Sequence, residues 1–240
     1  ALENPERKIG RIYLTRFAEK KFLTYLNKFP YDKTKNFPNY KFIEADEMNE
    51  LVKKENKFNS NHQGIIAYIK PLKERTLEHY FININKEKNE KHHILLLDNV
   101  TDFGNIASIT RSAFAFEMDA IVINKRTFDN ENGNFSKISV GASEKIPFIK
   151  VTNIARSLDK FKENGFTIVG FDNKGNSKFS DLKNNDLIVL ILGSEGKGMR
   201  RLTKNLCDFT IPININKNCE SLNVAVAASI AMHEIYNFKY

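Results

Sequence analysis

Residues 94–116 read ILLLDNVTDFGNIASITRSAFAF, and this stretch decides the fold that the sequence predicts. Its first four residues form a short apolar run, which is typical of a strand buried on both faces. A loop rich in Asp, Asn and Thr follows, and apolar residues at helical spacing then predict a helix over 105–116. A buried strand that leads through a polar loop into a helix is one repeat of a parallel α/β sheet.

The same alternation of apolar strands and amphipathic helices continues along the rest of the sequence. The pattern predicts strands at 120–123, 167–171 and 187–192 and helices at 154–163 and 222–238. We therefore expect a parallel sheet covered by helices on both faces. Ligands of such sheets bind beyond the carboxyl ends of the strands. This rule directs attention to three loops, at 98–105, at 193–198 and before Leu222.

A change of composition between residues 70 and 93, which includes a charged run, indicates a domain boundary. We expect a small α/β domain at 1–88 and the sheet domain at 89–240. Within the small domain, apolar spacing predicts helices at 11–29 and 45–54, and the run IIAYI at 65–69 predicts a strand.

The charge of the chain favours a polyanionic partner. Among 240 residues, 37 Lys and Arg outweigh 29 Asp and Glu, which gives a net charge of +8. Many lysines stand beside asparagines, as in 85–91, and this is equally typical of a solvated surface. The charge by itself therefore leaves nucleic-acid binding and an ordinary polar surface open.

Cys207 and Cys219 are the only cysteines, and their spacing is not that of a metal site. We expect two reduced thiols, a cytoplasmic protein and no bound metal. The longest apolar runs, at 187–192 and 224–228, are far shorter than the roughly 20 residues that cross a bilayer. No apolar signal-peptide core stands near residue 1, so no contact with a membrane is expected.

The first loop and its helix hold one residue that suggests chemistry. Asp98, Asn99 and Asp102 are explained well as turn and cap residues. Arg111 differs, because its guanidinium is predicted to lie among the apolar residues of the helix and would need a carboxylate or phosphate partner there. A functional role is favoured, and a structural ion pair is the alternative.

The other two loops place glycine or small polar residues before a helix. In LGSEGKGM at 192–199, three glycines would let a ligand approach the backbone closely, while Glu195 could instead cap the next helix. Ser221 and Asn223 precede an alanine-rich helix at positions where N-caps belong, so capping competes with a functional role. The alanines of that helix suit either a crowded core or a subunit interface; they stand at 225, 228 and 231.

Taken together, three segments resemble the three motifs of the SpoU/TrmH family of RNA 2′-O-ribose methyltransferases. They are DNVTDFGNIASITR at 98–111, LGSEGKGM at 192–199 and ESLNVAVA at 220–227, in the order of the family. A further family feature is SVGA at 139–142. NHQGIIA at 61–67 resembles the end of the ribosomal-L30e-like substrate domain of many members, and this likeness favours the guanosine 2′-O-methyltransferases of 23S ribosomal RNA.

The resemblance implies an α/β fold in which the sheet domain is tied in a deep trefoil knot and follows an L30e-like domain. It implies a homodimer that binds RNA, with S-adenosylmethionine as the cofactor. Backbone groups near Gly193, Ile213 and Leu222 would hold the cofactor. Arg111 would act on the ribose hydroxyl, and the residues that position it, the ribose and the phosphate would be Asn105, Glu195, Ser221 and Asn223.

The resemblance has two departures and leaves several alternatives. Phe103 stands where the family often has Pro. Ile211 and Pro212 lie two residues farther from Ser-Leu-Asn than usual, which leaves the register of the cofactor loop open. One register places Ile213 at the isoleucine position of the family. Whether Arg111 removes the proton or orients the hydroxyl is also open. Transfer RNA is the alternative substrate, and a non-catalytic RNA-binding or ribosome-assembly protein and a TrmD-type base methyltransferase are the alternative functions.

Overall fold

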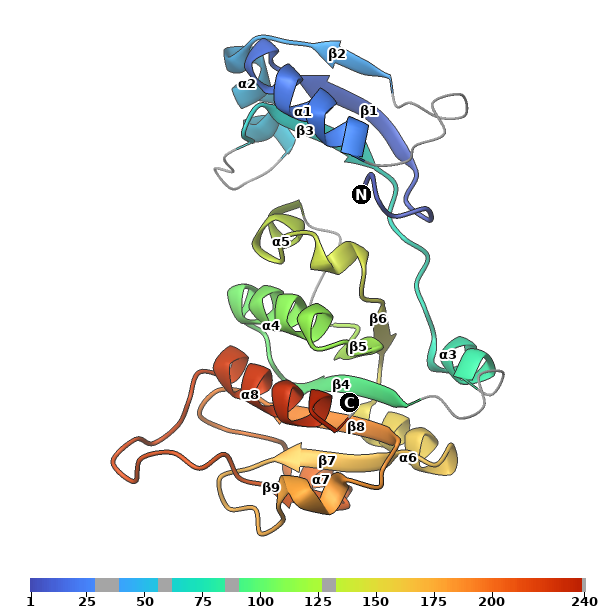
Figure 1. Ribbon diagram of the computed structural model, residues 1–240, viewed down its shortest axis with the longest axis vertical. Helices are drawn as coiled ribbons and strands as arrows, with labels where there is room; N and C mark the ends of the chain where they lie inside the picture. Colours follow the sequence, from blue (N-terminus) through green and yellow to red (C-terminus); the bar gives the residue numbers. More distant parts are fainter. Residues whose placement is uncertain (29–38, 56–61, 85–90, 127–132, 239–240) are drawn as a thin grey trace. The chain divides into compact units, whose positions relative to one another are not determined.

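The computed structural model describes residues 1–28, 39–55, 62–84, 91–126 and 133–238, which fold into two compact units, Ala1–Leu72 and Lys73–Tyr240 (Figure 1). This division lies earlier than the expected boundary between 88 and 89, which falls in 85–90, outside the described residues. The helix α3, Leu77–Ile84, belongs to the second unit because Leu77 and Phe81 are buried in the core of that unit. Packing of these two side chains therefore sets the division.

The second unit is built on a six-stranded sheet whose strands are all parallel, as the alternation of strands and helices predicts. The order across the sheet is β6-β5-β4-β8-β7-β9, so β4 and β8 lie at its centre. The short edge strands β6 and β9 are not evident in the sequence pattern. The bounds of the strands are β4 (His92–Asp98), β5 (Ala120–Asn124), β6 (Phe148–Val151), β7 (Thr167–Phe171), β8 (Leu187–Gly193) and β9 (Phe209–Ile211).

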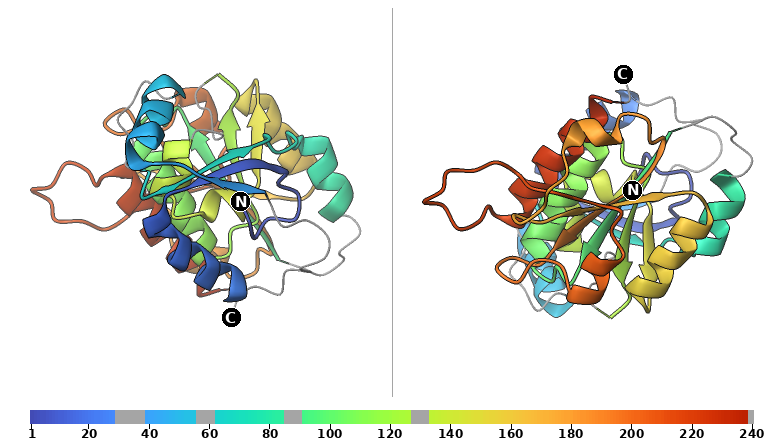
Figure 2. Two further views of the ribbon diagram at one scale, coloured as in Figure 1. Left: turned by 90° about the horizontal axis from the view of Figure 1, so that it is seen from above. Right: turned by 90° about the horizontal axis from the view of Figure 1, so that it is seen from below.

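Helices cover both faces of this sheet. On one face lie α4 (Phe103–Ala115) and α8 (Val224–Tyr236), and on the other lie α3 and α6 (Ile154–Glu163), as Figures 1 and 2 show. The sequence predicts α4, α6 and α8 with ends that agree to within two residues. The start of α4 is set by Asp102, whose Oδ1 accepts a hydrogen bond of 2.7 Å from the backbone N–H of Asn105, so its role as a cap is confirmed.

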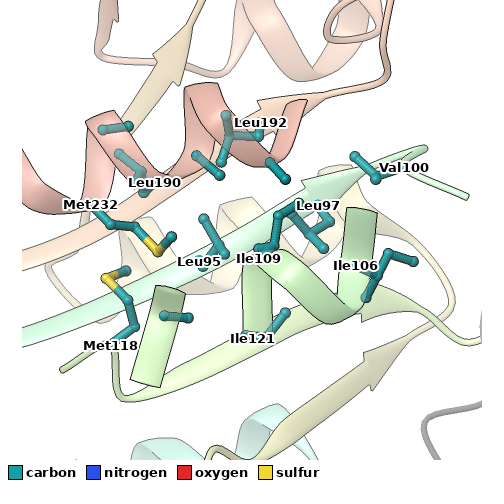
Figure 3. Close-up of a cluster of buried hydrophobic side chains, with 14 of the residues drawn as sticks. Leu95, Leu97, Val100, Ile106, Ile109, Met118, Ile121, Leu190, Leu192 and Met232 are labelled. Carbon is teal, nitrogen blue, oxygen red and sulfur yellow. The ribbon is translucent and has the colours of Figure 1, made fainter. Parts of the chain in front are cut away.

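Alternate residues of the central strands face opposite layers of helices. Leu95 and Leu97 of β4 are buried in a cluster with α4 and α8, whereas Ile94 and Leu96 are buried in a second cluster with α3 and α6. Figure 3 shows the first cluster, where leucines of β4 and β8 meet isoleucines of α4. This alternation follows from the two-residue period of a strand. Because both faces are covered, the strands read as continuous apolar runs.

The small residues of α8 pack inside the chain itself. Ala228 and Ala231 are fully buried, and Ala225 is nearly so, in the cluster that α4 and α8 form with the sheet. Ser112 of α4 and Ser229 of α8 share a hydrogen bond of 2.8 Å, so the two helices approach closely. The interpretation of the alanine strip as a contact between subunits is therefore wrong. It is a core contact, the other arrangement that the spacing allows.

The first unit is a small α/β layer with a three-stranded sheet in the order β2-β1-β3. β1 pairs in parallel with β2 and antiparallel with β3. The helix expected at 11–29 is wrong in its first part, because Ile12 and Leu14 are buried strand residues that alternate with more exposed ones; Phe29 lies outside the described residues. The bounds are β1 (Ile9–Leu14), α1 (Arg16–Lys28), β2 (Tyr40–Phe42), α2 (Ala45–Glu55) and β3 (Ile65–Ile69).

Several short elements connect the longer ones in the second unit. They are α5 (Gly133–Ile138), α7 (Arg201–Asn205) and single 3₁₀ turns at Ala142–Glu144 and Phe179–Leu182. Elements this short leave too few positions for a periodic pattern to show in the sequence. In the part of the chain that the structure describes, no helix is long and apolar enough to span a membrane.

Candidate functional site

The loop after β8, residues 193–198, is a tight hairpin that requires its glycines, and we call it the glycine loop. The backbones of Ser194 and Gly198 exchange two hydrogen bonds, of 3.1 and 2.8 Å. Gly196 and Gly198 have φ angles of 77° and 66°, in the left-handed region. A Cβ at Gly193 would lie 2.0 Å from the carbonyl carbon of Gly198 and 2.1 Å from the backbone nitrogen of Met199. The loop therefore folds back over Gly193 only because that residue has no side chain.

A cavity of about 660 Å³ opens at the carboxyl ends of β7 and β8, where ligands of parallel sheets bind. Its volume falls in the range of small-molecule sites, roughly 300–1,000 Å³. Five residues that the sequence singles out line this cavity, and they come from the loop after β8 and the segment before α8. They are Gly193, Glu195, Ile213, Ser221 and Leu222.

The segment between β9 and α8 supplies one wall of the cavity. Figure 2 shows it as an extended loop, drawn orange to red, that projects from the second unit. Ile211 ends β9 and is 1% exposed in the core, whereas Ile213 lines the cavity. Ile215 lines the cavity as well, so the register of this loop stays open, and the assignment of Ile213 to the isoleucine position of the family stays a prediction.

Asn105 and Asn223 join the first and third segments of the resemblance. The side-chain amide of Asn223 donates a hydrogen bond of 3.0 Å to Oδ1 of Asn105. Oδ1 of Asn223 accepts one of 2.9 Å from the backbone N–H of Ala225, so Asn223 is the N-cap of α8. Capping is confirmed for Asn223, and its amide group contacts Asn105 as well. Ser221 is not the cap and lies at the cavity with its side chain exposed.

An ion pair that the sequence does not predict joins the end of β4 to Arg200, which follows the loop after β8. Asp98, at the end of β4, is fully buried and accepts hydrogen bonds from the backbone N–H and Nε of Arg200, at 2.9 and 2.7 Å. Such charge-assisted contacts offset the cost of burying a carboxylate. A signal exists in the sequence, because Asp98 directly follows an apolar run and a carboxylate at the end of a central strand needs a cation. Asn99, at a φ of 62°, is the turn residue expected there.

The end of β7 and the residues after it supply a further part of the cavity, outside the three loops predicted from the sequence. Residues 171–174 line it, and Oδ2 of Asp172 lies 2.7 Å from Nζ of Lys204. Burial raises the pKa of Asp172, but its hydrogen bonds with Lys204 and the backbone of Lys174, together with their charges, outweigh burial and hold that pKa below its usual value. The carboxylate is therefore ionised at neutral pH. The rule that loops after parallel strands line the site predicts this segment, because the strand at 167–171 is evident in the sequence.

The rim of the cavity carries charges of both signs. Glu195 and Glu220 have exposed side chains, as do Lys197 and Arg201. The interpretation of Glu195 as a cap is wrong, because the N-cap of α7 is Arg200 and no side chain caps that helix. The carboxylate of Glu195 is therefore exposed at the rim and takes no part in capping α7.

Arg111 lies outside this cavity. Its side chain is exposed, and within the described ranges it makes no hydrogen bond or ion pair. The expectation that Arg111 lies among apolar side chains of its helix is wrong, because Ile106, Ile109 and Ala113 face the core and Arg111 lies on the outward face of α4. Its guanidinium is available to a group from outside this part of the chain.

The fold and the site define an α/β protein that holds a small ligand at the carboxyl edge of a parallel sheet. Comparison with known proteins narrows this class. The SpoU rRNA Methylase family matches residues 92–233. YacO of Bacillus subtilis, described as a TrmH family tRNA/rRNA methyltransferase, is 39% identical over 175 residues, which are 73% of this chain and 70% of the relative. The chain belongs to the SpoU/TrmH family of RNA methyltransferases.

Solved structures confirm the parallel-sheet α/β fold. The SpoU methyltransferase AviRb from Streptomyces viridochromogenes, in complex with its cofactor AdoMet, has a TM-score of 0.74 at 20% identity and covers 96% of this chain and 83% of its own. A structure described as an RNA 2′-O ribose methyltransferase has a TM-score of 0.73 at 17% identity and covers 97% of this chain and 82% of its own.

Proposed function

We propose that this chain transfers the methyl group of S-adenosylmethionine to a ribose 2′-hydroxyl of RNA. Family membership supports RNA methyl transfer, and the resemblance of the three motifs supports the ribose as acceptor. The observation that carries the proposal is the convergence of two separate segments on one cavity, with Glu195 on one side and Ser221 and Leu222 on the other. The proposed acceptor is a guanosine of 23S ribosomal RNA, and transfer RNA is the alternative.

The cavity fits S-adenosylmethionine in size and in chemistry. Leu192, Ile213 and Leu222 give it apolar walls that suit the faces of an adenine ring, and the glycine loop lets a ligand approach the backbone. The exposed carboxylates of Glu195 and Glu220 suit a ligand with positive charges on its sulfur and amino group, and the exposed Lys197 and Arg201 suit the carboxylate of the same ligand. When bound, the cofactor supplies an electrophilic methyl group.

The residues of the chain then have to prepare the ribose oxygen. A ribose hydroxyl is a weak nucleophile at neutral pH, so it has to be held in line while its proton leaves. Arginine stays protonated in proteins, so Arg111 would bind a phosphate beside the target nucleotide and stabilise the developing alkoxide. Glu195 and Ser221 would hold the ribose at the rim, and the hydrogen bond between Asn105 and Asn223 would fix the start of α4 against α8.

A homodimer would complete this site. Val226 and Ile230 stand about one turn apart on α8 and are 49% and 37% exposed, and the neighbouring α4 exposes Phe114 and Arg111. Exposed apolar side chains that lie together on a protein surface often mark a site of contact with another molecule. The outward faces of α4 and α8, in place of the alanine strip, are therefore the proposed dimer contact. This arrangement would bring Arg111 to a site shared between subunits.

Ile230→Arg is expected to convert the dimer to a monomer, because a charge in an apolar contact has to be desolvated when the subunits meet. Methyl transfer should fall with it. Sedimentation equilibrium measures the first effect, and transfer of labelled methyl groups measures the second. Ile82→Arg on α3, an exposed isoleucine of the opposite layer, is the matched control and should change neither. A wild-type chain that is monomeric and fully active would contradict the shared site.

The knot and the L30e-like domain are further parts of the proposal. β9 lies at the edge of the sheet beside β7, whereas α8 packs on α4 and β8 near the centre. The segment 212–223 therefore returns from the edge toward the centre of the sheet, and we propose from the family resemblance that it is part of a knot, which most folds avoid. The small α/β layer of the first unit, with His62 to Gly64 at the turn into β3, supports an L30e-like RNA-binding domain.

RNA affinity is expected to fall steeply as salt is added. A net charge of +8 favours several contacts between lysines and phosphates, and each adds about −0.7 to −0.9 to the slope of log K against log salt concentration. Fluorescence anisotropy of labelled RNA at a series of potassium chloride concentrations measures the slope. Affinity for S-adenosylmethionine, measured in the same buffers, is the control. An RNA affinity that does not change with salt would contradict binding through phosphates.

The choice of RNA is tested by offering methyl-labelled S-adenosylmethionine with transcripts of 23S ribosomal RNA and of transfer RNAs. The expected result is label in the ribosomal transcript, at a guanosine. Label in transfer RNA alone would select the alternative substrate. Cofactor binding without label in any RNA would favour the non-catalytic alternative.

A further inference from the structure

A second cavity lies within the first unit, and it is lined by residues from the start of α1 and from the turn that leads into β3. Figure 1 labels both elements. Its volume is about 1020 Å³, and Phe17 lines it while remaining 95% exposed. Among the described residues, no aromatic ring lies against Phe17. An open aromatic face at a concave site offers a flat ligand a surface on which to stack.

One wall of this pocket is fixed by the turn at His62, Gln63 and Gly64. The backbone N–H of Gly64 donates to Nδ1 of His62 at 2.9 Å, and Nε2 of His62 lies 3.0 Å from Oδ1 of Asn49, so both ring nitrogens are engaged. Gly64 has a φ of 80°, and a Cβ there would lie 2.5 Å from Oγ1 of Thr15. The turn leaves Gln63 exposed at the pocket with a φ of 51°, which fixes where its side chain leaves the backbone.

The charged groups that line the pocket are cationic. Lys20 and Lys21 line it, and neither forms an ion pair within the described part of the chain. Asp46 and Glu47 follow Ala45 at the start of α2 but do not line the pocket, so the charge that lines it comes from the lysines of α1. Residues 1–72 hold 14 Lys and Arg against nine Asp and Glu, which is +5 of the total charge of +8. The pocket is therefore complementary to a ligand that joins a flat ring to a negative group.

We propose that this pocket binds one unpaired nucleotide of the RNA substrate. The base stacks on Phe17, and Lys20 and Lys21 hold its phosphate. A base is free to stack in this way only in a loop, a bulge or a single strand. The inference rests on the proposed RNA substrate and concerns its recognition, at a place separate from the methyl-transfer cavity.

Phe17→Ala is expected to raise the KM for RNA by roughly 5- to 100-fold, the effect of losing one stack between a base and an aromatic ring. The kcat and the affinity for S-adenosylmethionine should not change. Because Phe17 packs on no core, the thermal unfolding curve should match that of the wild type. Tyr68→Ala removes an exposed aromatic of the same unit that does not line the pocket and should leave the KM unchanged.

Direct binding separates the failure of this inference from the failure of the proposed function. A labelled single-stranded RNA oligonucleotide of mixed sequence, and its duplex with a complementary strand, are titrated with each protein. The wild type should prefer the single strand. Phe17→Ala, and Lys20→Glu combined with Lys21→Glu, should lose that preference, while Lys41→Glu, an exposed lysine of β2, should keep it.

Equal KM values and equal binding for the wild type and Phe17→Ala would overturn the inference even where methyl transfer proceeds. If Phe17→Ala without RNA sediments as a different oligomer from the wild type and its RNA binding is unchanged, the pocket binds a second copy of the chain. That result would overturn the inference too. If no transcript accepts a methyl group, the proposed function alone fails, and the binding comparison still decides this inference.

Discussion

Arg111→Ala is expected to lower methyl transfer by about 100-fold or more while the affinity for S-adenosylmethionine stays within a few-fold. Arg111 is exposed on α4 and does not line the cavity, so its loss leaves the proposed cofactor contacts in place. Removing one group that stabilises a developing oxyanion costs about 10²–10³ in rate. Calorimetric titration measures the affinity, and transfer of labelled methyl groups measures the rate.

Two further variants sharpen this test. Arg156→Ala removes an exposed arginine at the start of α6, on the opposite face of the sheet, and should change neither quantity. Arg111→Lys keeps the charge but loses the planar fork that binds phosphate through two donors, so it should transfer methyl groups at an intermediate rate. Full turnover in Arg111→Ala would remove Arg111 from the mechanism, and an equal loss of binding and transfer would make its role structural.

Gly193→Ala is expected to weaken the binding of S-adenosylmethionine by about 100-fold or more, equivalent to roughly 3 kcal/mol. The added Cβ would lie within 2.4 Å of three backbone atoms of Gly198 and Met199. A backbone contact cannot be relieved by turning a side chain, so the loop has to move away from the cavity that it lines. Calorimetric titration measures the affinity, and thermal unfolding should show a lower Tm.

Two control variants, Gly196→Ala and Gly141→Ala, measure the effect of backbone strain without the steric contact that a Cβ makes at residue 193. Both residues have left-handed φ angles, 77° and 80°, and a Cβ at either would meet nothing within 4 Å. Each substitution therefore adds only the strain of that conformation, about 1–2 kcal/mol. Gly141→Ala, away from the cavity, should lower stability and leave cofactor affinity unchanged. Binding of the cofactor by Gly193→Ala as tightly as by the wild type would show that the glycine loop is not a wall of its site.

The centre of the fold is predictable from sequence, and its edges are not. β4 and β8 are buried on both faces, so their apolar runs identify them as central parallel strands. β2 and β9 have three residues each, too few for an alternating pattern to stand out. The helix predicted at 11–29 includes β1 because Ile12 and Leu14, two residues apart as in a strand, stand shortly before Phe22 and Leu26, four residues apart as on one face of a helix.

Site residues are predictable from the sequence where the topology of the sheet brings their loops to one edge. They are not predictable where the result depends on the direction of one side chain or on the path of one loop. Gly193 and Leu222 meet at one cavity because parallel strands end at one edge. Apolar neighbours in the sequence do not give the direction of Arg111, because residues that are adjacent in a helix point to different faces of it. The pairing of Asp98 with Arg200 depends on the path of the glycine loop, which no local pattern specifies.

The central claim is that the methyl group goes to a ribose oxygen, and the chemistry of the labelled RNA tests it most directly. A 2′-O-methyl group blocks attack of that oxygen on the neighbouring phosphate, so alkali leaves the bond beside it intact. Alkaline hydrolysis of the labelled RNA, followed by mass spectrometry, should recover the label in an alkali-resistant dinucleotide containing 2′-O-methylguanosine, with none from Arg111→Ala. Label recovered in mononucleotides that carry a methylated base would contradict the account.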